Sequence, residues 1–361
     1  MATLTWIGGT GNWNVLTNWL NGIAPDSTTG ADDVDISVGG GITTSHTTGN
    51  TVINNLNSTD AFTLSGGTLT ANLVDVDNTF TLAGGVLIGA TVDTAGGDVN
   101  FTNNSNNILD NVTFNGDINL DQSGSLVRLR NGTTFTGNVN ASSNSARLWL
   151  EDAQTLDNTT INLTGSSSGI GLSGQGTYAV IFGANLQINL DGASSFIRDD
   201  QFFNQTGSVV NQGTITADGT VSLTSDRDIN VDSFTNTGAI VAVSGVEFNL
   251  GGTGVGETFL NDTTGTITAS GGSRIRLRGD WDNNGTITLQ DTSILELEGS
   301  GNSTADLGTI NQSNDSTVFI ETVLDNTGDT LTLDANAGSY TLNGGTILGG
   351  TVDQSGGNFL N

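Results

Sequence analysis

The chain has 361 residues, and its eight basic residues, all Arg, stand against 37 acidic ones for a formal charge of −29. This balance excludes phosphate recognition by a basic face, so we expect no nucleic acid partner and no binding to an anionic membrane surface. Absence of Cys excludes disulfides and Cys-ligated zinc, and neither a membrane-spanning apolar run nor a secretory signal behind Met1 is present, so no membrane insertion is expected.

Residues 1–35 differ in composition from the rest of the chain, and we predict that they form an N-terminal cap. The only Pro falls there, and so do three of the five Trp, at Trp6, Trp13 and Trp19. A stack of repeats needs an atypical terminal unit to cover the open end of its core, and large aromatic side chains suit that role. The alternative is that the Trp cluster stacks on carbohydrate.

From residue 36 to residue 361 the pattern is that of β-strands. Apolar and polar residues alternate in runs such as 246–250, β-branched residues are abundant, and Gly occupies 52 positions. Runs of strong helix formers are rare. We therefore predict an all-β chain.

A motif of the form Asn-x-Gly-x-Ile recurs along this stretch. It occupies 211–215 and 236–240, and variants around Gly265, Gly285 and Gly308 follow, so that successive glycines are 25, 27, 20 and 23 residues apart. A motif repeated every 20–30 residues is typical of a solenoid in which each repeat forms one coil. At roughly 18–27 residues per coil, the part after the cap forms about 14 coils of a parallel β-solenoid.

Two neighbouring repeats predict a ladder of opposite charges. The runs 273–279 and 293–299 are 20 residues apart and read Ser-Arg-Ile-Arg-Leu-Arg-Gly and Ser-Ile-Leu-Glu-Leu-Glu-Gly. Stacking them places Ile275 and Leu277 over apolar residues in the core and alternate residues outside. With the preceding repeat, the predicted outward rungs are Glu247 over Arg274, Arg276 over Glu296, and Arg278 over Glu298. Chance placement of charges on a solvated face is the alternative, but it does not explain why they follow the Gly spacing.

A second pair of repeats, 21 residues apart, combines charge with an aromatic ring. Arg128-Leu-Arg130 aligns with Trp149-Leu-Glu151. We therefore expect Arg130 to face Glu151 and Arg128 to lie against the ring of Trp149.

The Asn residues of the motif are expected to stack at the coil corners. Asn tolerates left-handed turns, and its amide can hydrogen-bond to an Asn in the coils above and below. The Gly beside it allows a sharp corner. The residues assigned to this corner stack are Asn211, Asn236 and Asn284.

The last coil repeats an earlier one. Residues 340–361 match residues 80–101 at ten of 22 positions, including both Gly-Gly pairs, and no cap signal follows. A bare coil end exposes strand edges that invite the addition of another chain. We therefore expect either continuation into further solenoid or end-to-end self-association.

The opening Trp6-Ile-Gly-Gly-Thr-Gly-Asn-Trp13 and the Asn-x-Gly-Thr-Ile coils resemble a known group. They are similar to the right-handed β-helix stalks of large bacterial secreted adhesins, such as autotransporter passenger domains and filamentous-haemagglutinin-like exoproteins. The resemblance covers essentially the whole chain and implies extracellular display and attachment to a surface glycan or protein. The sequence departs from the pattern in having no translocator barrel, secretion-domain signature or signal peptide, which leaves the export route open.

The rival class is a β-helix enzyme acting on polysaccharide, because fold alone does not decide function. The lyases of that group resemble one another in using a basic residue and Ca²⁺, and here no Lys exists and most Arg are assigned to ladders. The hydrolases would have an Asp pair, a Gly-His-Gly and an Arg-Ile-Lys. Asp199-Asp200 is present, but the only His is His46 and Arg274-Ile-Arg276 lacks the Lys. We predict that the chain is not an enzyme.

Cofactors are not expected. Two carboxylates fall on one side of a strand or in one turn at three places, which are Asp75 with Asp77, Asp226 with Asp228, and Asp280 with Asp282. Ca²⁺ takes six to eight oxygen ligands, so we interpret these pairs as a solvated acidic face, with Ca²⁺ as the alternative. His46 is expected at the surface or in the cap.

The sequence thus predicts a right-handed parallel β-helix with an aromatic cap over residues 1–35 and coils over residues 36–361. We expect a non-enzymatic, secreted or surface-displayed bacterial protein of adhesive and structural function. A subunit that stacks end to end into an extracellular filament or sheath is the alternative, and a polysaccharide-acting enzyme is a minor one.

Overall fold

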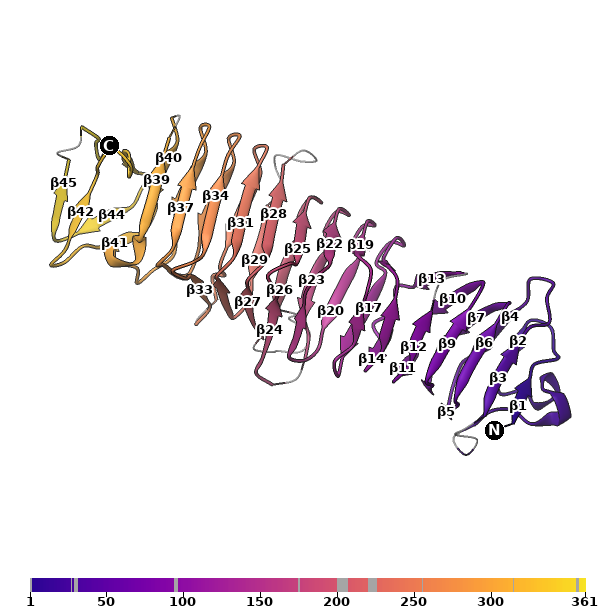
Figure 1. The fold of residues 1–361 in the computed structure, drawn as a ribbon. Helices are drawn as coiled ribbons and strands as arrows, with labels where there is room; N and C mark the ends of the chain where they lie inside the picture. Colours follow the sequence, from indigo (N-terminus) through magenta and orange to yellow (C-terminus); the bar gives the residue numbers. More distant parts are fainter. Residues whose placement is uncertain are drawn as a thin grey trace. The chain divides into compact units, whose positions relative to one another are not determined.

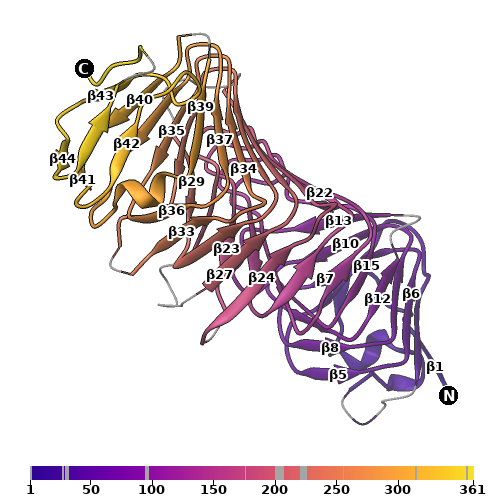
Figure 2. The ribbon, with the colours of Figure 1, turned by 60° about the vertical axis from the view of Figure 1, so that its left-hand side comes forward.

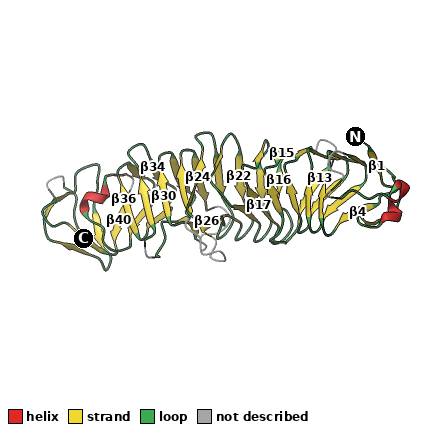
Figure 3. Cartoon of the chain, turned by 90° about the horizontal axis from the view of Figure 1, so that it is seen from below, coloured by secondary structure: helices red, strands yellow, loops and turns green. Residues whose placement is uncertain are grey.

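The computed structural model describes residues 2–26, 28, 32–93, 97–174, 176–199, 207–219, 226–254, 256–313, 315–354 and 357–361. Over these residues the chain is an all-β parallel solenoid of about 14 turns, which confirms the predicted fold class (Figure 1). The described helices are three short 3₁₀ turns, none of them long and apolar enough to cross a membrane: η1 (Leu16–Asn18), η2 (Leu20–Gly22) and η3 (Thr304–Leu307) (Figure 3). The chain divides into two compact units, Met1–Asp152 and Ala153–Asn361.

In the first unit, parallel strands of successive coils pair one after another (Figure 2). One sheet has the order β1 (Thr3–Thr5), β3 (Asp33–Ile36), β6 (Asn55–Ser58), β9 (Leu73–Val76), β12 (Thr91–Asp93), β15 (Thr113–Asn115), β18 (Thr134–Phe135). The second runs β2 (Gly11–Asn12), β4 (Thr43–His46), β7 (Ala61–Leu64), β10 (Thr79–Leu82), β13 (Asp98–Phe101). The third runs β5 (Asn50–Val52), β8 (Thr68–Thr70), β11 (Val86–Ile88), β14 (Ile108–Asp110), β17 (Leu126–Arg130), β20 (Arg147–Leu150), while β16 (Ile118–Asn119) pairs with β19 (Val139–Ala141).

The second unit repeats this plan. Its first sheet runs β23 (Gly169–Leu172), β26 (Phe196–Asp199), β29 (Arg227–Asn230), β32 (Glu247–Leu250), β35 (Arg274–Leu277), β38 (Ile294–Leu297), β40 (Thr317–Ile320), β43 (Tyr340–Leu342). The next runs β22 (Thr160–Leu163), β25 (Gln187–Leu190), β28 (Thr214–Asp218), β31 (Ala239–Val243), β34 (Thr266–Ala269), β37 (Thr286–Leu289), β39 (Thr309–Gln312). The third runs β21 (Gln154–Leu156), β24 (Tyr178–Phe182), β27 (Gly207–Asn211), β30 (Ser233–Asn236), β33 (Thr258–Asn261), β36 (Asp280–Asn283).

The last two coils of this unit form two short pairs of their own. β41 (Val323–Asp325) pairs with β44 (Thr346–Leu348), and β42 (Thr330–Thr332) pairs with β45 (Thr351–Asp353). The 3₁₀ turn η3 precedes them and contacts β36.

The Ile of the repeated motif forms a continuous apolar row inside the second unit. Ile215, Ile240, Ile267, Ile287 and Ile310 pair one above the other along β28, β31, β34, β37 and β39, and each is at most 6% exposed. Burying a side chain of this size contributes about 1.5–3 kcal/mol. Because a slip of one residue would turn every Ile outward, the row also fixes the register of the coils.

The Gly of the motif is required by the close approach of neighbouring coils. A Cβ atom at Gly238 would overlap the carbonyl oxygen of Gly213, and a Cβ atom at Gly285 would overlap that of Gly265. The backbone at these four positions does not adopt a positive φ. Small size is therefore the reason for Gly at these four positions, whereas Gly308, with φ at 55°, also has the left-handed backbone that the sequence suggested.

Candidate functional site

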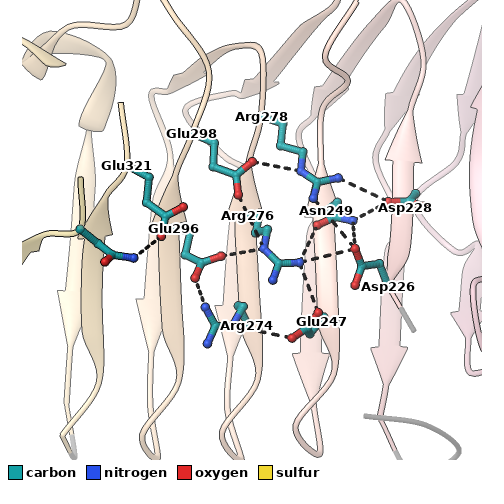
Figure 4. Close-up of polar contacts among 11 residues, drawn as sticks. Asp226, Asp228, Glu247, Asn249, Arg274, Arg276, Arg278, Glu296, Glu298 and Glu321 are labelled. Atoms are coloured by element: carbon teal, nitrogen blue, oxygen red, sulfur yellow. Dashed lines mark hydrogen bonds and ion pairs between the residues drawn. The ribbon is translucent and has the colours of Figure 1, made fainter. Parts of the chain in front are cut away.

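Among the described residues of the second unit, a group of interacting charges lies on the outer face of β29, β32, β35 and β38 (Figure 4). We call it the charged ladder. Six carboxylates, three guanidinium groups and one amide compose it: Asp226, Asp228, Glu247, Glu296, Glu298, Glu321, Arg274, Arg276, Arg278 and Asn249.

Strand pairing places these side chains in rows across the coils. In β35, Arg274 pairs with Glu247 of β32, and Arg276 pairs with Glu296 of β38. On the other face of the same strands, Ile275 lies between Phe248 and Leu295 in the core. The structure thus has the acid–base–acid rows and the apolar rows that the repeat spacing predicts. Both arise together because side chains alternate between the faces of a strand.

Arg276 is the centre of the ladder. Its Nε lies 2.6 Å from Glu296 Oε2 and 3.6 Å from Glu298 Oε1, and its Nη1 lies 3.3 Å from Glu247 Oε2 and 3.5 Å from Asp226 Oδ2. The Glu296 side chain is only 5% exposed and that of Arg276 is 17% exposed. Ion pairs shielded to this degree are screened less than surface pairs, and losing one partner leaves an uncompensated charge.

The two flanking Arg residues extend the network. Arg278 Nε lies 3.3 Å from Glu298 Oε2, and Arg278 Nη1 lies 3.9 Å from Asp228 Oδ1. Arg274 pairs diagonally with Glu296, and its Nε lies 3.9 Å from Glu247 Oε1. Glu296 is therefore shared by two guanidinium groups. Its contact with Arg274 is diagonal, and an alignment that pairs each residue only with the one directly above or below does not predict it.

Asn249 and the two Asp residues beside it belong to the ladder but were not predicted as members. The amide of Asn249 donates to Asp226 Oδ2 at 3.0 Å and to Asp228 Oδ1 at 2.6 Å, and its oxygen accepts from Arg276 Nη1 at 3.4 Å. Burial alone would raise the pKa of Asp226, but the Asn249 amide, a hydrogen bond with Glu247 and the two nearby guanidinium groups together lower it. Aligning Ile229 over Leu250 would have revealed this row, because it places Asp228 over Asn249.

Three carboxylates at one edge of the ladder lie close together. Oxygens of Glu296, Glu298 and Glu321 all lie within 4.8 Å of one another, the one such group of three in the described part of the chain. Each already has a donor, since Glu321 accepts from Asn343 Nδ2 at 2.6 Å and the other two pair with Arg. The three Asp pairs considered for Ca²⁺ do not form a group of this kind, and Asp226 and Asp228 have Arg and Asn partners.

The first unit carries a smaller ladder on β17 and β20. Arg128 lies 5.8 Å from the centre of the Trp149 ring, as the alignment predicts, and also pairs with Glu151. Arg130 lies 4.0 Å from Glu151 Oε2, but its closest partner is Asp110 Oδ2 at 2.8 Å, from β14 of the preceding coil. The sequence alignment used only the following coil and therefore missed Asp110.

A buried stack of Asn side chains runs along β27, β30, β33 and β36. Asn211 Nδ2 donates to Asn236 Oδ1 at 2.8 Å, Asn236 donates to Asn261 at 2.8 Å, and Asn261 donates to Asn283 at 2.6 Å. Asn283 then donates to the carbonyl oxygen of Leu307 at 2.6 Å. A chain of satisfied hydrogen bonds makes burial of these polar groups tolerable.

The assignment of Asn284 to this stack was wrong. Asn284 is exposed, and its amide donates to Asp282 Oδ2 at 2.9 Å. The stacking Asn lies two residues before the Gly at Asn211, Asn236 and Asn283, whereas Asn284 lies directly before it. Because side chains alternate along a strand, a shift of one residue turns the amide outward. Consistent use of the Asn-x-Gly spacing would have selected Asn283.

The Trp residues of the cap form one buried cluster. Trp6, Trp13 and Trp19 are at most 1% exposed, with ring centroids 5.1 and 5.0 Å from the Trp19 ring, and Trp13 lies 5.6 Å from Phe62. Strands β1 and β2 within the predicted cap also pair in parallel with β3 and β4. The cluster therefore covers the first coils of the core. The alternative, stacking of these rings on carbohydrate, is wrong because no ring face is accessible.

His46 lies in the core beneath this cluster and not at the surface. It is 0% exposed, its ring lies 5.7 Å from that of Trp13, and its nitrogens are 2.9 Å from Gly66 O and 2.9 Å from Thr51 Oγ1. Burial lowers the pKa of the imidazole, against the opposing effect of its hydrogen bonds with backbone carbonyls. A histidine in this position is a packing residue with both ring nitrogens engaged.

Comparison of the chain with protein-family models, curated proteins and solved structures finds no match.

Of the Asp pair considered for a hydrolase, Asp200 lies outside the described residues. Asp199 ends β26, and its Oδ2 accepts the backbone N–H of Asp232 at 2.6 Å. Burial raises the pKa of Asp199 to about 7, and the nearby carboxylates of Asp232 and Glu257 add to this effect. Arg274 and Arg276, which were weighed for the same chemistry, have their carboxylate partners in the charged ladder.

Proposed function

We propose that this protein is a non-enzymatic structural β-solenoid that is secreted or displayed on a bacterial surface, in the manner of an adhesin stalk. The observation that carries the proposal is the charged ladder. Its three Arg residues each contact carboxylates of neighbouring coils, so these ion pairs join one coil to the next. A protein whose cationic and aromatic side chains are used to hold coils together is suited to a scaffold.

The burial of large aromatic groups supports the same function. All five Trp are at most 8% exposed, and the three at the N-terminus cover the core. A ligand would therefore meet the Thr, Asn, Ser and Asp side chains that face outward on the strands. We infer that a surface glycan or a protein partner would bind by hydrogen bonds to such side chains and not by stacking on Trp.

Composition agrees with extracellular use. A chain without Cys has no thiol to oxidise outside the cell, and 37 acidic residues keep a long repeat protein soluble through mutual repulsion. The similarity of the Trp6–Trp13 opening to large secreted adhesins points the same way.

Surface labelling of the producing cells tests the proposal. Antibodies against the purified chain should label intact cells, and protease added to intact cells should remove the label. Label that appears only after permeabilisation would reject extracellular display. The non-enzymatic part is tested separately by incubating the chain with polygalacturonate and measuring reducing ends. Release that disappears in an Asp199→Asn variant would identify an enzyme instead.

A further inference from the structure

A cavity of about 330 Å³ lies between two successive coils of the second unit. It is lined by β39 of one coil and by β42 of the next (Figure 1). Among the described residues no strand pairing joins these two, since β39 pairs with β37 and β42 pairs with β45. The wall of the solenoid is therefore interrupted between two coils that each have a further coil on their other side.

The inner surface of this cavity is apolar. Leu307, Ile310 and Leu331 line it and are each at most 6% exposed. Ile310 belongs to the apolar row of motif Ile residues, so the cavity reaches the core of the solenoid. The ring of Tyr340, which is 2% exposed, lines it as well. A ligand that enters the cavity would meet an apolar floor.

Tyr340 carries a hydroxyl group that packing of the core does not require. The equivalent position in the similar run 80–101 is Phe80, which is 2% exposed and stacks on Phe62. Burial raises the pKa of Tyr340 and the nearby carboxylate of Asp334 raises it further, so the hydroxyl stays protonated and can donate. Among the described residues none forms a hydrogen bond with this hydroxyl. Because a buried Tyr hydroxyl usually has a partner, it marks a place for a ligand atom in the cavity.

Polar groups form the rim around the apolar floor. Asp334 is exposed, and its Oδ1 accepts the backbone N–H groups of Ala337 and Asn336, each at 2.8 Å. These hydrogen bonds lower the pKa of Asp334 and keep it ionised, while its Oδ2 has no partner within the described part of the chain. The exposed side chains of Thr309 and Thr330 add hydroxyl groups. The described residues that line the cavity include no Arg, Lys or His.

Hydrogen bonds hold both ends of the cavity in place. At one end, Gln312 of β39 donates its backbone N–H to Asn336 O at 2.8 Å and its side-chain amide to Ala337 O. At the other end, Thr304 of η3 donates to Asn326 Oδ1 at 2.9 Å. Floor and rim are thus held in fixed relative positions, and a preformed site loses little freedom when a ligand binds.

We propose that this cavity binds one neutral pyranose unit of a surface glycan, with a C–H face of the sugar on the apolar floor and its hydroxyl groups on the rim. The inference rests on the adhesin-like function proposed for the chain and gives its glycan a site. Asp334 accepts hydrogen bonds from sugar hydroxyls, and the Tyr340 hydroxyl donates one to a sugar oxygen.

Size and charge favour this ligand class. Ligand pockets range from about 300 to 1,000 Å³, so this cavity is at the lower end and suits one sugar unit. A uronic acid or a phosphorylated sugar would bring a negative charge to Asp334 without a cation to offset it. A pyranose has an apolar C–H face and a ring of hydroxyl groups, which match the floor and the rim.

Saturation-transfer difference NMR of the purified full chain tests the site. The probes are the methyl β-glycosides of D-glucose, D-galactose, D-mannose and N-acetyl-D-glucosamine, which imitate a sugar linked into a glycan. At least one should receive saturation, strongest on the C–H protons of one ring face, with a dissociation constant on the order of 1 mM. Methyl β-D-glucuronide should bind at least about 10-fold more weakly than the best neutral probe.

Three results would overturn the proposal at this stage. The first is that none of the four glycosides receives saturation, and the second is that the glucuronide binds as well as the neutral probes. The third is that the free sugars bind and their glycosides do not, because the ligand would then be a free sugar and not a glycan.

Two conservative variants locate the bound sugar. Tyr340→Phe removes only the hydroxyl and introduces the residue that fills the same position at Phe80, so the fold should be retained while the dissociation constant rises roughly 3- to 10-fold. Asp334→Asn keeps an oxygen for the two backbone N–H groups but loses the free carboxylate oxygen, and it should weaken binding at least about 10-fold. Circular dichroism checks that both variants are folded.

Asp325→Asn is the matched control. Asp325 is exposed and its Oδ1 accepts the backbone N–H of Thr327 at 2.8 Å, a local arrangement like that of Asp334, but it does not line the cavity. This variant should bind the sugar as the wild type does. Weakening equal to that of Asp334→Asn would show that net charge governs binding, and wild-type binding by all three variants would place the sugar elsewhere. Either result rejects the site.

Failure of the site and failure of the proposed function are distinguishable. A chain that is displayed on intact cells but binds no glycoside would reject the sugar site alone. A chain that binds a glycoside through Tyr340 and Asp334 but is absent from the cell surface would reject extracellular display and leave the site in place.

Discussion

Arg276 makes contacts that no single coil could supply. Its guanidinium group reaches Glu296 in β38, Glu247 in β32 and Asp226 before β29, so four consecutive coils meet at one side chain. The planar guanidinium group presents five N–H donors in a fixed arrangement, whereas the ammonium group of Lys presents three. The use of Arg alone among the basic residues is understandable in these terms.

Reversal of this charge should be strongly destabilising. In Arg276→Glu the new carboxylate would face those of Glu296, Glu247 and Asp226, and we expect a loss of about 3 kcal/mol or more in the free energy of unfolding. Adding Glu296→Arg should restore part of it. Urea unfolding measures both, and strict additivity of the two changes would reject direct coupling of this rung. Arg198→Glu is the control, because it makes the same charge reversal at an Arg that is exposed and lies over the ring of Phe196.

The Asn stack permits an equally local test. Asn283→Ala would leave Asn261 without its acceptor in a buried position, and we expect a loss of about 1–3 kcal/mol. Asn284→Ala, one residue away and exposed, should change stability by less than about 0.5 kcal/mol. Thermal unfolding of the two variants side by side checks the assignment, and equal losses would contradict it.

At the scale of the element, the cap determines how well the first coils are protected. β1 and β2 hydrogen-bond to β3 and β4, and Trp13 packs on His46 and Phe62 inside the coils. The cap is therefore continuous with the sheets it covers. Loss of its packing should loosen the adjacent coils before distant ones, because each repeat contacts only its neighbours.

Trp13→Ala tests the cap directly. Truncating a fully buried Trp typically costs about 3–5 kcal/mol, and the cavity would lie above Phe62. Amide hydrogen exchange should accelerate in β3, β4 and β7 and remain unchanged in β14 and beyond. Leu16→Ala, which removes an exposed side chain of η1, should leave exchange unaltered. Uniform acceleration along the whole chain would instead show that the cap stabilises all coils cooperatively.

At the scale of the whole molecule, burial of carboxyl groups makes the stability of the fold depend on pH. Among the described residues, burial raises the pKa of Asp75, Asp152, Asp191, Asp199, Asp232 and Asp282. The pKa values of Asp226, Asp325 and Asp334 are lowered instead. A carboxyl group with a raised pKa holds its proton in the folded state at a pH where the unfolded state releases it. Because the pKa of Asp199 is about 7 in the folded state, its contribution to stability should rise as the pH falls from 8 towards about 5.

Asp199 and Asp226 provide opposite tests of this pH dependence. The pKa of Asp199 is about 7 when folded, so Asp199→Asn should increase stability at pH 8 and have little effect near pH 4. The pKa of Asp226 is lowered, so Asp226→Asn should decrease stability at pH 8. Urea unfolding at both pH values checks the signs. His46 opposes the trend below about pH 6.5, because its lowered pKa means that acid favours the unfolded state.

Much of this molecule could be predicted from the sequence because its contacts repeat. The step between motif glycines gives the offset between coils, and that offset correctly places Ile275 over Leu295, Glu247 over Arg274 and Arg276 over Glu296. Each strand of a coil pairs with the equivalent strands of the coils above and below it. The offset between these strands in the sequence is the repeat step, so an alignment of successive repeats is enough to find the paired residues.

Only the tertiary structure shows the contacts and the burial that do not follow from the step between repeats. The diagonal pair between Arg274 and Glu296 and the burial of His46 arise from side chains that reach across rows or fill space between sheets. Repeat spacing contains no information on such reach. The same holds for exposure: Leu342 and Leu82 occupy equivalent positions in similar runs, and only the coils packed against them determine that one is buried and the other is not.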